Sequence, residues 1–393
     1  MKFNNSIRLN IYQVGILFIT CLLPVFELSA QNPVTPYSVQ GWWAPAPPMF
    51  SPAVDSLAHI TFRFKAPDAK KISLSFGEWN IKPMAMRKDS SVWSITIGPV
   101  KPGIYTYSFI VDGIPMVDMS NPVCKNGSSM YGSIVEVAGP VARFDQIQQV
   151  PHGLIQIQRY TSGSLHLPRS MYVYLPPAYA ADKNRRFPIL YLRHGGGDNE
   201  SSWTQPSGRA DIILENLLAQ NKAVPMIIVM TNGLTDGSWS GGSSKEGMDL
   251  LEAELLEDVI PLVKKTYRVL PGRESCAIAG LSMGGGQAYI MGLRNLDKFA
   301  WIGEFSSGLL SDATFDMNTR APGIFKNTFI LNKQLKLLWM GCGIDDPRFA
   351  GHQQLAVSLD KLHVTHTVYN VEGGHEWTVW REELFQFLQK LFK

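Results

Sequence analysis

The sequence predicts an α/β fold with a mostly parallel central sheet, preceded by a small all-β sandwich. From about residue 154 onward, apolar runs of strand length alternate with longer stretches whose apolar residues recur every three or four positions. Over residues 31–138 only short alternating runs occur, separated by turn residues. The change of pattern predicts two domains joined by a linker at residues 139–153, which is rich in turn-forming residues.

Composition narrows the class of protein. The 393 residues are 45% hydrophobic, which is enough apolar material for two or three domains with their own cores. The net charge is +3 and no block of lysine and arginine stands out, so neither a nucleic-acid partner nor a polybasic membrane patch is predicted. Four cysteines in a chain of this length exclude a fold held together by disulfides.

Residues 1–30 have the features of a secretory signal peptide. Two basic residues precede an apolar stretch at 14–23, and the segment 28–30 offers small residues at the cleavage positions. The stretch is too short to span a bilayer comfortably, so we expect an exported bacterial protein, periplasmic or secreted, with no stable membrane insertion. Cys21 offers a lipoprotein alternative, but the apolar stretch continues beyond it.

The segment 31–138 is expected to form a β-sandwich because several runs alternate apolar and polar side chains. These runs are 59–64, 72–76, 93–97 and 105–111. The stretch 93–113 resembles the early-set immunoglobulin-like domain, of the glycogen-binding type, found beside glycoside-active enzymes. Two roles stay open for it: packing support for the next domain, or sugar binding through Trp42, Trp43 or Trp79.

The segment 154–393 begins with two strand-like runs and continues as strand–helix alternation. The strand-like runs are 155–160, 171–175, 188–192, 226–230, 276–279, 301–305, 335–340 and 365–371. The helix-like runs are 210–219, 250–267, 285–293, 353–362 and 380–392. This order predicts a mostly parallel sheet with helices on both faces.

One serine stands where a strand-like run gives way to a helix-like run. Residues 280–284 read GLSMG, a G-x-S-x-G motif with Ser282 at its centre. Such a turn holds the serine in a strained backbone conformation, and the flanking glycines let neighbouring chain approach closely. The hydroxyl then lies near a helix N-terminus, which stabilises a developing anion. The pattern predicts that Ser282 is a catalytic nucleophile.

A serine nucleophile needs a base and an acid, and in this arrangement both follow it along the chain. Of the four downstream histidines, His375 comes directly after the last strand-like run and two glycines, so we predict it as the base. The acid is expected after the preceding strand, where Asp345 and Asp346 are adjacent. Asp346 is favoured as the acid that orients the imidazole, and Asp345 is the alternative.

A second glycine-rich stretch follows the strand-like run at 188–192. Residues 194–197 read HGGG, the loop type that supplies one oxyanion donor, and this predicts an oxyanion hole formed by the N–H groups of Gly196 and Met283. A phosphate-binding loop is excluded because the Walker lysine and the Rossmann glycine spacing are absent. No H-x-x-x-H or C-x-x-C pair occurs, so neither a metal site nor a cofactor is predicted.

Several motifs, in this order, resemble carbohydrate esterase family 1 over about residues 150–393. They are the stretches 150–153, 191–198, 280–287, 297–303, 338–343 and 373–381. The resemblance implies an α/β-hydrolase whose triad is Ser282, His375 and Asp346. It also implies a feruloyl or acetylxylan esterase acting on plant xylan. Arg193 stands where an apolar residue is usual in that family, a departure that could alter the pocket rim.

The expected function is hydrolysis of feruloyl (hydroxycinnamoyl) esters on arabinoxylan, so the expected partner is feruloylated or acetylated xylan or its oligosaccharides. Trp203 and Trp377 lie near the oxyanion and base loops and are candidates for substrate binding. The long segment 308–334 is expected to line the acyl pocket. Its candidates for that role are Phe315, Ile324 and Phe325. The alternatives are an acetylxylan esterase, an enterochelin-esterase-like hydrolase, a formylglutathione hydrolase, and a glycan-binding protein with an inactive hydrolase domain.

Overall fold

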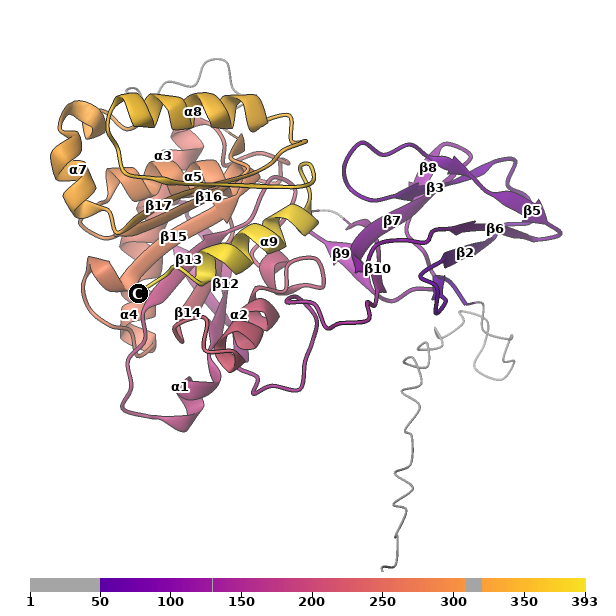
Figure 1. Cartoon of the computed structure of the whole chain (residues 1–393), viewed down its shortest axis with the longest axis horizontal. Helices are drawn as coiled ribbons and strands as arrows, with labels where there is room; N and C mark the ends of the chain where they lie inside the picture. The colour runs from indigo at the N-terminus through magenta and orange to yellow at the C-terminus, as the bar shows by residue number, and fades with distance from the viewer. Residues whose placement is uncertain (1–49, 129, 309–319) are drawn as a thin grey trace, which may run out of the picture. The chain divides into compact units, whose positions relative to one another are not determined.

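An eight-stranded sheet forms the centre of the C-terminal half of the computed structural model, in the order β11-β12-β14-β13-β15-β16-β17-β18 (Figure 1). The strands are β11 (Leu154–Ser162), β12 (Leu167–Leu175), β13 (Ile189–Arg193), β14 (Ile227–Thr231), β15 (Cys276–Leu281), β16 (Trp301–Phe305), β17 (Leu337–Gly343) and β18 (Thr367–Val371). β11 pairs antiparallel with β12, and β12 pairs antiparallel with β14. All other neighbours are parallel, so the sheet is mixed but mostly parallel, as the sequence predicts.

The structure describes residues 50–128, 130–308 and 320–393, and all of them fall in one compact unit. The predicted signal peptide lies outside the described residues, as do Trp42 and Trp43. None of the described helices is long and apolar enough to cross a membrane.

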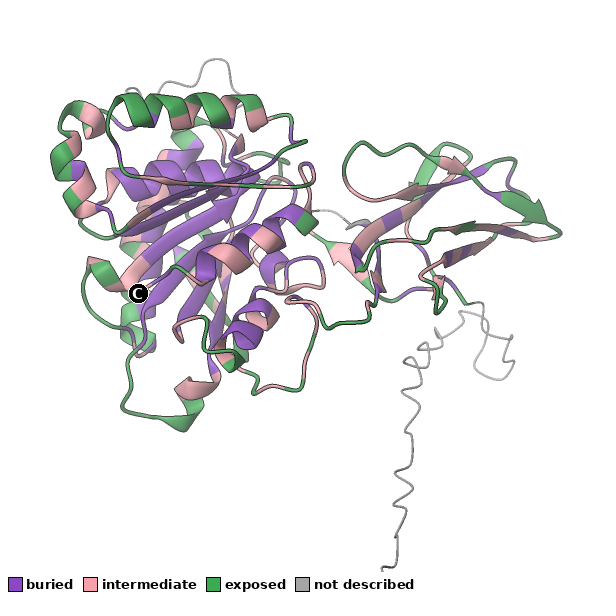
Figure 2. Cartoon of the chain, viewed as in Figure 1, coloured by how far each residue is buried: buried purple, intermediate pink, exposed green. Residues whose placement is uncertain are grey.

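Helices cover both faces of the sheet because its strands are apolar on both sides. In β13, for example, Ile189 and Tyr191 belong to one buried cluster and Leu190 and Leu192 to the other. The first cluster is covered by α1 (Pro177–Ala181), α3 (Lys245–Ala253), α4 (Ile260–Thr266), α5 (Ser282–Arg294), α7 (Thr328–Gln334) and α8 (Phe349–Lys361). The second is covered by α2 (Ala210–Ala219) and α9 (Trp377–Leu388). Figure 2 shows the buried residues concentrated on the strands, while α7 and α8 turn exposed faces outward.

The predicted helix at 250–267 is continuous but irregular. A π-helical turn, Glu254–Val259, lies between α3 and α4. Pro261 is near the start of α4 and has no N–H to donate, so the regular hydrogen-bond ladder cannot run through it. The periodicity therefore located this helix but could not reveal its change of register.

Residues 50–137 are called the N-terminal half here, and two antiparallel sheets form it. Their strand orders are β1-β2-β6-β5 and β4-β3-β7-β10-β9, with β8 paired to β7. The strands are β1 (Ala53–Val54), β2 (Ile60–Lys65), β3 (Ile72–Phe76), β4 (Met84–Ala85), β5 (Arg87–Asp89), β6 (Val92–Ile97), β7 (Gly103–Val111), β8 (Ile114–Met116), β9 (Cys124–Asn126) and β10 (Met130–Val137). Phe62 and Trp93 of the first sheet share a buried cluster with Leu74 and Phe109 of the second. The four alternating runs predicted from sequence are all strands.

β10 was not predicted from the sequence although it is eight residues long. Gly132 and Ser133 interrupt its apolar alternation, and its register with β9 shifts between Met130 and Gly132. A bulge of this kind destroys the period of two that identifies a strand.

The segment predicted as a linker is held by a buried ion pair. Asp145 is 3% exposed, and its carboxylate accepts a hydrogen bond of 2.8 Å from Arg381 Nε on α9. The same guanidinium also donates to the carbonyl oxygens of Ser207 and Ile104. One side chain thus ties together the N-terminal half, the linker and the helical layer.

We expect Arg381→Met to lower the free energy of unfolding by about 1–3 kcal/mol, because Asp145 Oδ2 stays buried without its hydrogen-bond donor while Oδ1 remains paired with Arg143. Urea denaturation measures this loss. Lys101→Met is the control, since the Lys101–Glu372 pair is 85% and 82% exposed and its removal should leave stability unchanged within error. Equal stability of the two variants would contradict the role given to Arg381.

Candidate active site

Three side chains meet at the carboxyl ends of β15, β17 and β18. Ser282 follows β15 directly and is the first residue of α5, Asp346 lies in the loop after β17, and His375 in the loop after β18. Parallel strands of one sheet present their carboxyl ends at the same edge, so residues far apart in sequence come together there. The sheet topology therefore brings together the three residues that the sequence singled out.

The turn between β15 and α5 leaves no room for larger residues. Ser282 has a φ of +50°, a conformation that costs a non-glycine residue about 1–3 kcal/mol. A Cβ added at Gly280 would lie 2.4 Å from the carbonyl oxygen of Gly284, and one added at Gly284 would lie 2.2 Å from that of His194. Both glycines of the motif are thus required by close backbone approach.

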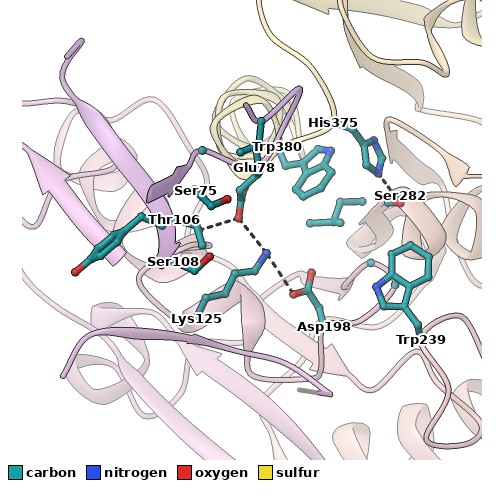
Figure 3. Close-up of a pocket in the computed structure, with 16 residues that line it drawn as sticks. Ser75, Glu78, Thr106, Ser108, Lys125, Asp198, Trp239, Ser282, His375 and Trp380 are labelled. Carbon is teal, nitrogen blue, oxygen red and sulfur yellow. Dashed lines mark hydrogen bonds and ion pairs between the residues drawn. The ribbon is translucent and has the colours of Figure 1, made fainter. Parts of the chain in front are cut away.

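A hydrogen-bonded chain links the three side chains. His375 Nε2 lies 2.9 Å from Ser282 Oγ (Figure 3). His375 Nδ1 lies 2.6 Å from Asp346 Oδ2. The tautomer with its proton on Nδ1 satisfies both contacts, because Nδ1–H donates to the carboxylate and Nε2 accepts from the hydroxyl. The neighbouring Asp345 is exposed, and its backbone N–H donates to the Gly373 carbonyl oxygen. Of the two candidate aspartates, only Asp346 reaches the imidazole.

The surroundings keep the histidine neutral and the aspartate ionised. Burial lowers the pKa of His375, and the hydrogen bond and charge of Asp346 offset this only in part. Burial opposes ionisation of Asp346, but the hydrogen bond and charge of His375, with Arg348, outweigh it and lower the pKa of the carboxyl. A neutral imidazole beside an ionised carboxylate can accept a proton from Ser282 and be stabilised as it does so.

The HGGG loop packs directly against the serine turn. A Cβ added at Gly195 would lie 3.2 Å from the Cβ of Ser282. His194 braces the loop, since Nδ1–H donates to the Gly195 carbonyl at 2.8 Å and Nε2 accepts from the Gly233 N–H at 2.8 Å. Burial lowers the pKa of His194 to about 4, so this imidazole is neutral. Gly196 lies on the pocket wall.

A pocket of about 320 Å³ opens beside Ser282 and His375. Its lining includes the indoles of Trp239 and Trp380, and the Trp380 ring meets the His375 ring edge-on with centroids 4.8 Å apart. Trp239 is 57% exposed and lies against the backbone of Gly196. Trp239 lies in the loop after β14, at the same edge of the sheet as the three catalytic candidates. Its place after a predicted strand is the feature of the sequence that could have identified it. Trp380 stands within the family-like motif at 373–381.

The prediction that Trp203 and Trp377 bind substrate is wrong, because both side chains lie in the core and not in the pocket. They are 1% and 2% exposed, and their rings pack edge-on with centroids 5.0 Å apart. Trp203 Nε1–H donates to the carbonyl of Arg193, which fixes that indole in the core. Neither side chain lines the pocket. Closeness in sequence to a catalytic loop did not imply closeness to its cavity.

Two further expectations about the pocket also need correction. Ile324 and Phe325 pack against the core cluster and do not line the pocket, while Phe315 lies outside the described residues. Arg193 is 2% exposed and its Nε donates to Gln287 Oε1 at 2.6 Å, so it is a core residue that does not reach the rim.

The far wall of the pocket comes from the N-terminal half, which sequence reasoning missed. Glu78 and Lys125 form an ion pair of 3.0 Å, and Lys125 Nζ lies 4.0 Å from the carboxylate of Asp198 (Figure 3). Burial raises the pKa of Asp198 to about 7, against the opposing charge of Lys125. Thr106 and Ser108 add hydroxyl groups to the same wall. The pocket is therefore aromatic near His375 and polar opposite. No group of histidine, cysteine and carboxylate side chains suited to a metal ion occurs among residues 50–128, 130–308 and 320–393.

These features define the class of the protein: the mixed sheet and the serine turn are those of an α/β-hydrolase, and the Ser–His–Asp arrangement is suited to ester hydrolysis. The putative esterase family matches residues 162–391, and the chain belongs to that family.

Curated relatives include xylan-degrading proteins. The endo-1,4-beta-xylanase/feruloyl esterase of Xylanibacter ruminicola is 32% identical over 351 residues, which cover 87% of this chain and 46% of that protein. The endo-1,4-beta-xylanase Y of Acetivibrio thermocellus is 27% identical over 191 residues, covering 46% of this chain and 17% of that protein. The chain thus spans less than half the length of these two relatives.

Known structures share the fold. A ferulic acid esterase of Anaeromyces mucronatus, in complex with ferulic acid, has a TM-score of 0.54 at 23% identity, covering 63% of this chain and 94% of that chain. The enterobactin esterase of Shigella flexneri has a TM-score of 0.64 at 17% identity, covering 85% of this chain and 92% of that chain. The second match extends beyond the eight-stranded sheet and its helices into the N-terminal half.

We expect Gly284→Ala to remove the activity of the site and to destabilise the protein by about 1–3 kcal/mol, because the new methyl group overlaps the His194 carbonyl. Thermal unfolding and labelling by a serine-reactive fluorophosphonate measure the two effects. Gly237→Ala is the stability control, since a Cβ there meets nothing within 4 Å. An unchanged melting temperature for Gly284→Ala would show that the turn is less constrained than its geometry indicates.

Proposed function

We propose that this protein is an exported serine esterase of carbohydrate esterase family 1 that hydrolyses feruloyl esters on arabinoxylan or its oligosaccharides. The observation that carries the proposal is the chain of hydrogen bonds from Ser282 through His375 to Asp346, opening onto a pocket with two indoles. The relative from Xylanibacter ruminicola, whose name includes feruloyl esterase, supports this substrate. Export rests on the leader-like residues 1–30.

In the proposed reaction, Ser282 Oγ attacks the ester carbonyl carbon while its proton passes to His375 Nε2. Asp346 stabilises the imidazolium through Nδ1–H. The N–H groups of Gly196 and Met283 bind the oxyanion, at the N-terminus of α5 where the helix dipole favours negative charge. The tetrahedral intermediate expels the sugar hydroxyl, which takes its proton from His375 and leaves an acyl-enzyme on Ser282.

Water completes the cycle. His375 takes a proton from a water molecule, which attacks the acyl carbonyl carbon, and collapse of the second tetrahedral intermediate returns the proton to Ser282 Oγ. The carboxylic acid is released and the enzyme regains its starting protonation.

The pocket favours an aromatic acyl group over acetyl. Trp239 and Trp380 offer ring faces and edges on which a phenolic ring can pack, and the polar wall beyond them can bind its hydroxyl group. A second candidate is an enterochelin-esterase-like hydrolase, because the enterobactin esterase of Shigella flexneri covers more of this chain than the ferulic acid esterase does. Both candidates use the same triad and differ in the ester that the pocket accepts.

We also propose the domain organisation given by the sequence: a signal peptide at 1–30, an early-set immunoglobulin-like domain at 31–138, a linker at 139–153 and the esterase domain at 154–393. The two antiparallel sheets around one core support the second of these assignments.

The substrate is tested by comparing acid release from methyl ferulate, acetylated xylan and enterobactin, with Ser282→Ala as the control. Ferulate release that disappears in Ser282→Ala is the expected result, because only the wild-type nucleophile can form the acyl-enzyme. Acetate release alone, or enterobactin hydrolysis alone, would replace the feruloyl assignment. Full activity of Ser282→Ala would overturn the mechanism.

The adjacent aspartates provide a matched test of the acid. We expect Asp346→Asn to lower kcat roughly 10³- to 10⁴-fold, since the imidazole loses its orienting carboxylate. Asp345→Asn should leave kcat near the wild-type value because Asp345 is exposed and does not contact His375. Similar kcat values for the two variants would contradict the assignment of Asp346.

The pH profile adds a second readout of the same pair. The base must be neutral, and the pKa of His375 lies below its ordinary value, so kcat/KM should be fully developed at neutral pH and fall only as the pH drops well into the acid range. Asp346 raises the pKa of His375, so Asp346→Asn should move this acid limb to still lower pH. A limb above pH 6.5 in the wild type would contradict the burial argument.

A further inference from the structure

The loop that carries His375 touches the N-terminal half of the chain on both sides of the histidine. On one side, the backbone of Gly374 lies against the indole of Trp79, so closely that an added Cβ would be 2.1 Å from Trp79 Cδ1. On the other side, the backbone N–H of Trp377 donates to Glu78 Oε2 at 2.9 Å. Two adjacent residues of the N-terminal half therefore bracket the imidazole.

Glu78 completes a helix that lacks a cap of its own. Within the described residues, Glu376 at the N-cap of α9 makes no side-chain capping hydrogen bond. The first N–H groups of a helix need an outside acceptor, and a carboxylate there also interacts favourably with the helix dipole. Glu78 supplies that acceptor from 299 positions earlier in the chain.

The Glu78 carboxylate is itself firmly held. Its side chain is 18% exposed, and Oε1 accepts hydrogen bonds from Thr106 Oγ1 at 2.9 Å and Lys125 Nζ at 3.0 Å. Burial works against ionisation, but Lys125 and the Trp377 N–H outweigh it, so the pKa of Glu78 is lowered and the carboxylate stays charged. Glu78 thus connects Thr106 on β7 and Lys125 on β9 to the start of α9, two residues after the base of the triad.

We propose that Glu78 is a positioning residue for the general base, so that the N-terminal half is needed for ester hydrolysis itself and not only for contact with a polymer. This inference rests on the proposed triad. A domain that only binds glycan would leave the turnover of a small soluble ester unchanged. A helix cap that fixes the position and orientation of His375 would affect the hydrolysis of every ester to the same extent.

The test is kcat and KM of the full-length Glu78→Gln variant on methyl ferulate, or on p-nitrophenyl acetate if ferulate is not accepted. An amide side chain can accept at one side only, so it loses either the Trp377 N–H or the Lys125 contact. We expect kcat to fall roughly 10- to 100-fold on either ester, because small displacements of a catalytic group are costly. KM is compared on p-nitrophenyl acetate in every case and should change little there, because its acetyl group has no hydroxyl for the polar wall to bind.

Glu136→Gln is the matched control. Glu136 also joins the two halves of the chain, through Arg209 at 2.7 Å, but it does not line the pocket, and its ion-pair partners among the described residues are Arg209 and Arg143, neither of which lies on α9. We expect its kcat to equal that of the wild type. Wild-type kcat for Glu78→Gln, or an equal loss in both variants, would overturn the proposal.

The pH profile separates positioning from general damage to the fold. The charged groups facing His375 are Asp346 and Glu78, which raise its pKa, and Arg348, which lowers it. Glu78→Gln removes a negative charge that raises the pKa of His375, so the acid limb of kcat/KM should move to lower pH. A lower kcat with an unmoved limb would indicate structural damage alone and would count against the proposal.

Two further variants keep the outcomes distinct. If Glu78→Gln does not fold, Glu78→Asp retains the charge but shortens the reach, and wild-type kcat in that variant would overturn the inference. Activity that survives in Ser282→Ala would instead contradict the proposed function. Loss in Ser282→Ala with full retention in Glu78→Gln would contradict only the role of Glu78.

Discussion

The strained turn at Ser282 is the constraint on which the rest of the site depends. A positive φ at a non-glycine residue persists only where the surroundings impose it, and here the backbone packing of Gly280 and Gly284 does so. The same packing sets the HGGG loop against the serine, because Gly284 meets the carbonyl oxygen of His194. The nucleophile and the loop proposed to bind the oxyanion therefore form one rigid body at the edge of the sheet.

Much of this arrangement could be predicted from the sequence because it depends on local patterns. The eight strands of the central sheet follow from apolar runs of strand length, and the glycines around Ser282 follow from the geometry of a tight strand-to-helix turn. The order of His375 and Asp346 after successive strands identified them as base and acid. In the structure His375 lies within hydrogen-bonding distance of both Ser282 and Asp346.

The pocket could not be predicted in the same way because its walls depend on side-chain direction and on contacts between distant segments. Trp203 and Trp377 are near the catalytic loops in sequence, yet they turn into the core, while Trp239 and Trp380 face the cavity. Glu78, in the loop after β3, and Lys125, on β9, reach the site from another sheet, and no periodicity or motif marks them. Their charges give the pocket a polar wall opposite its indoles, a pairing suited to a hydroxylated aromatic acyl group.

The central claim is that Ser282 is a nucleophile activated by His375. The most direct measurement is labelling of the folded protein with a fluorophosphonate probe, followed by mass spectrometry of its peptides. The structure predicts a single adduct on Ser282 and much slower labelling of His375→Ala, since the hydroxyl then lacks its base. An adduct on another residue, or an unchanged rate in His375→Ala, would contradict the catalytic role of the hydrogen-bonded chain.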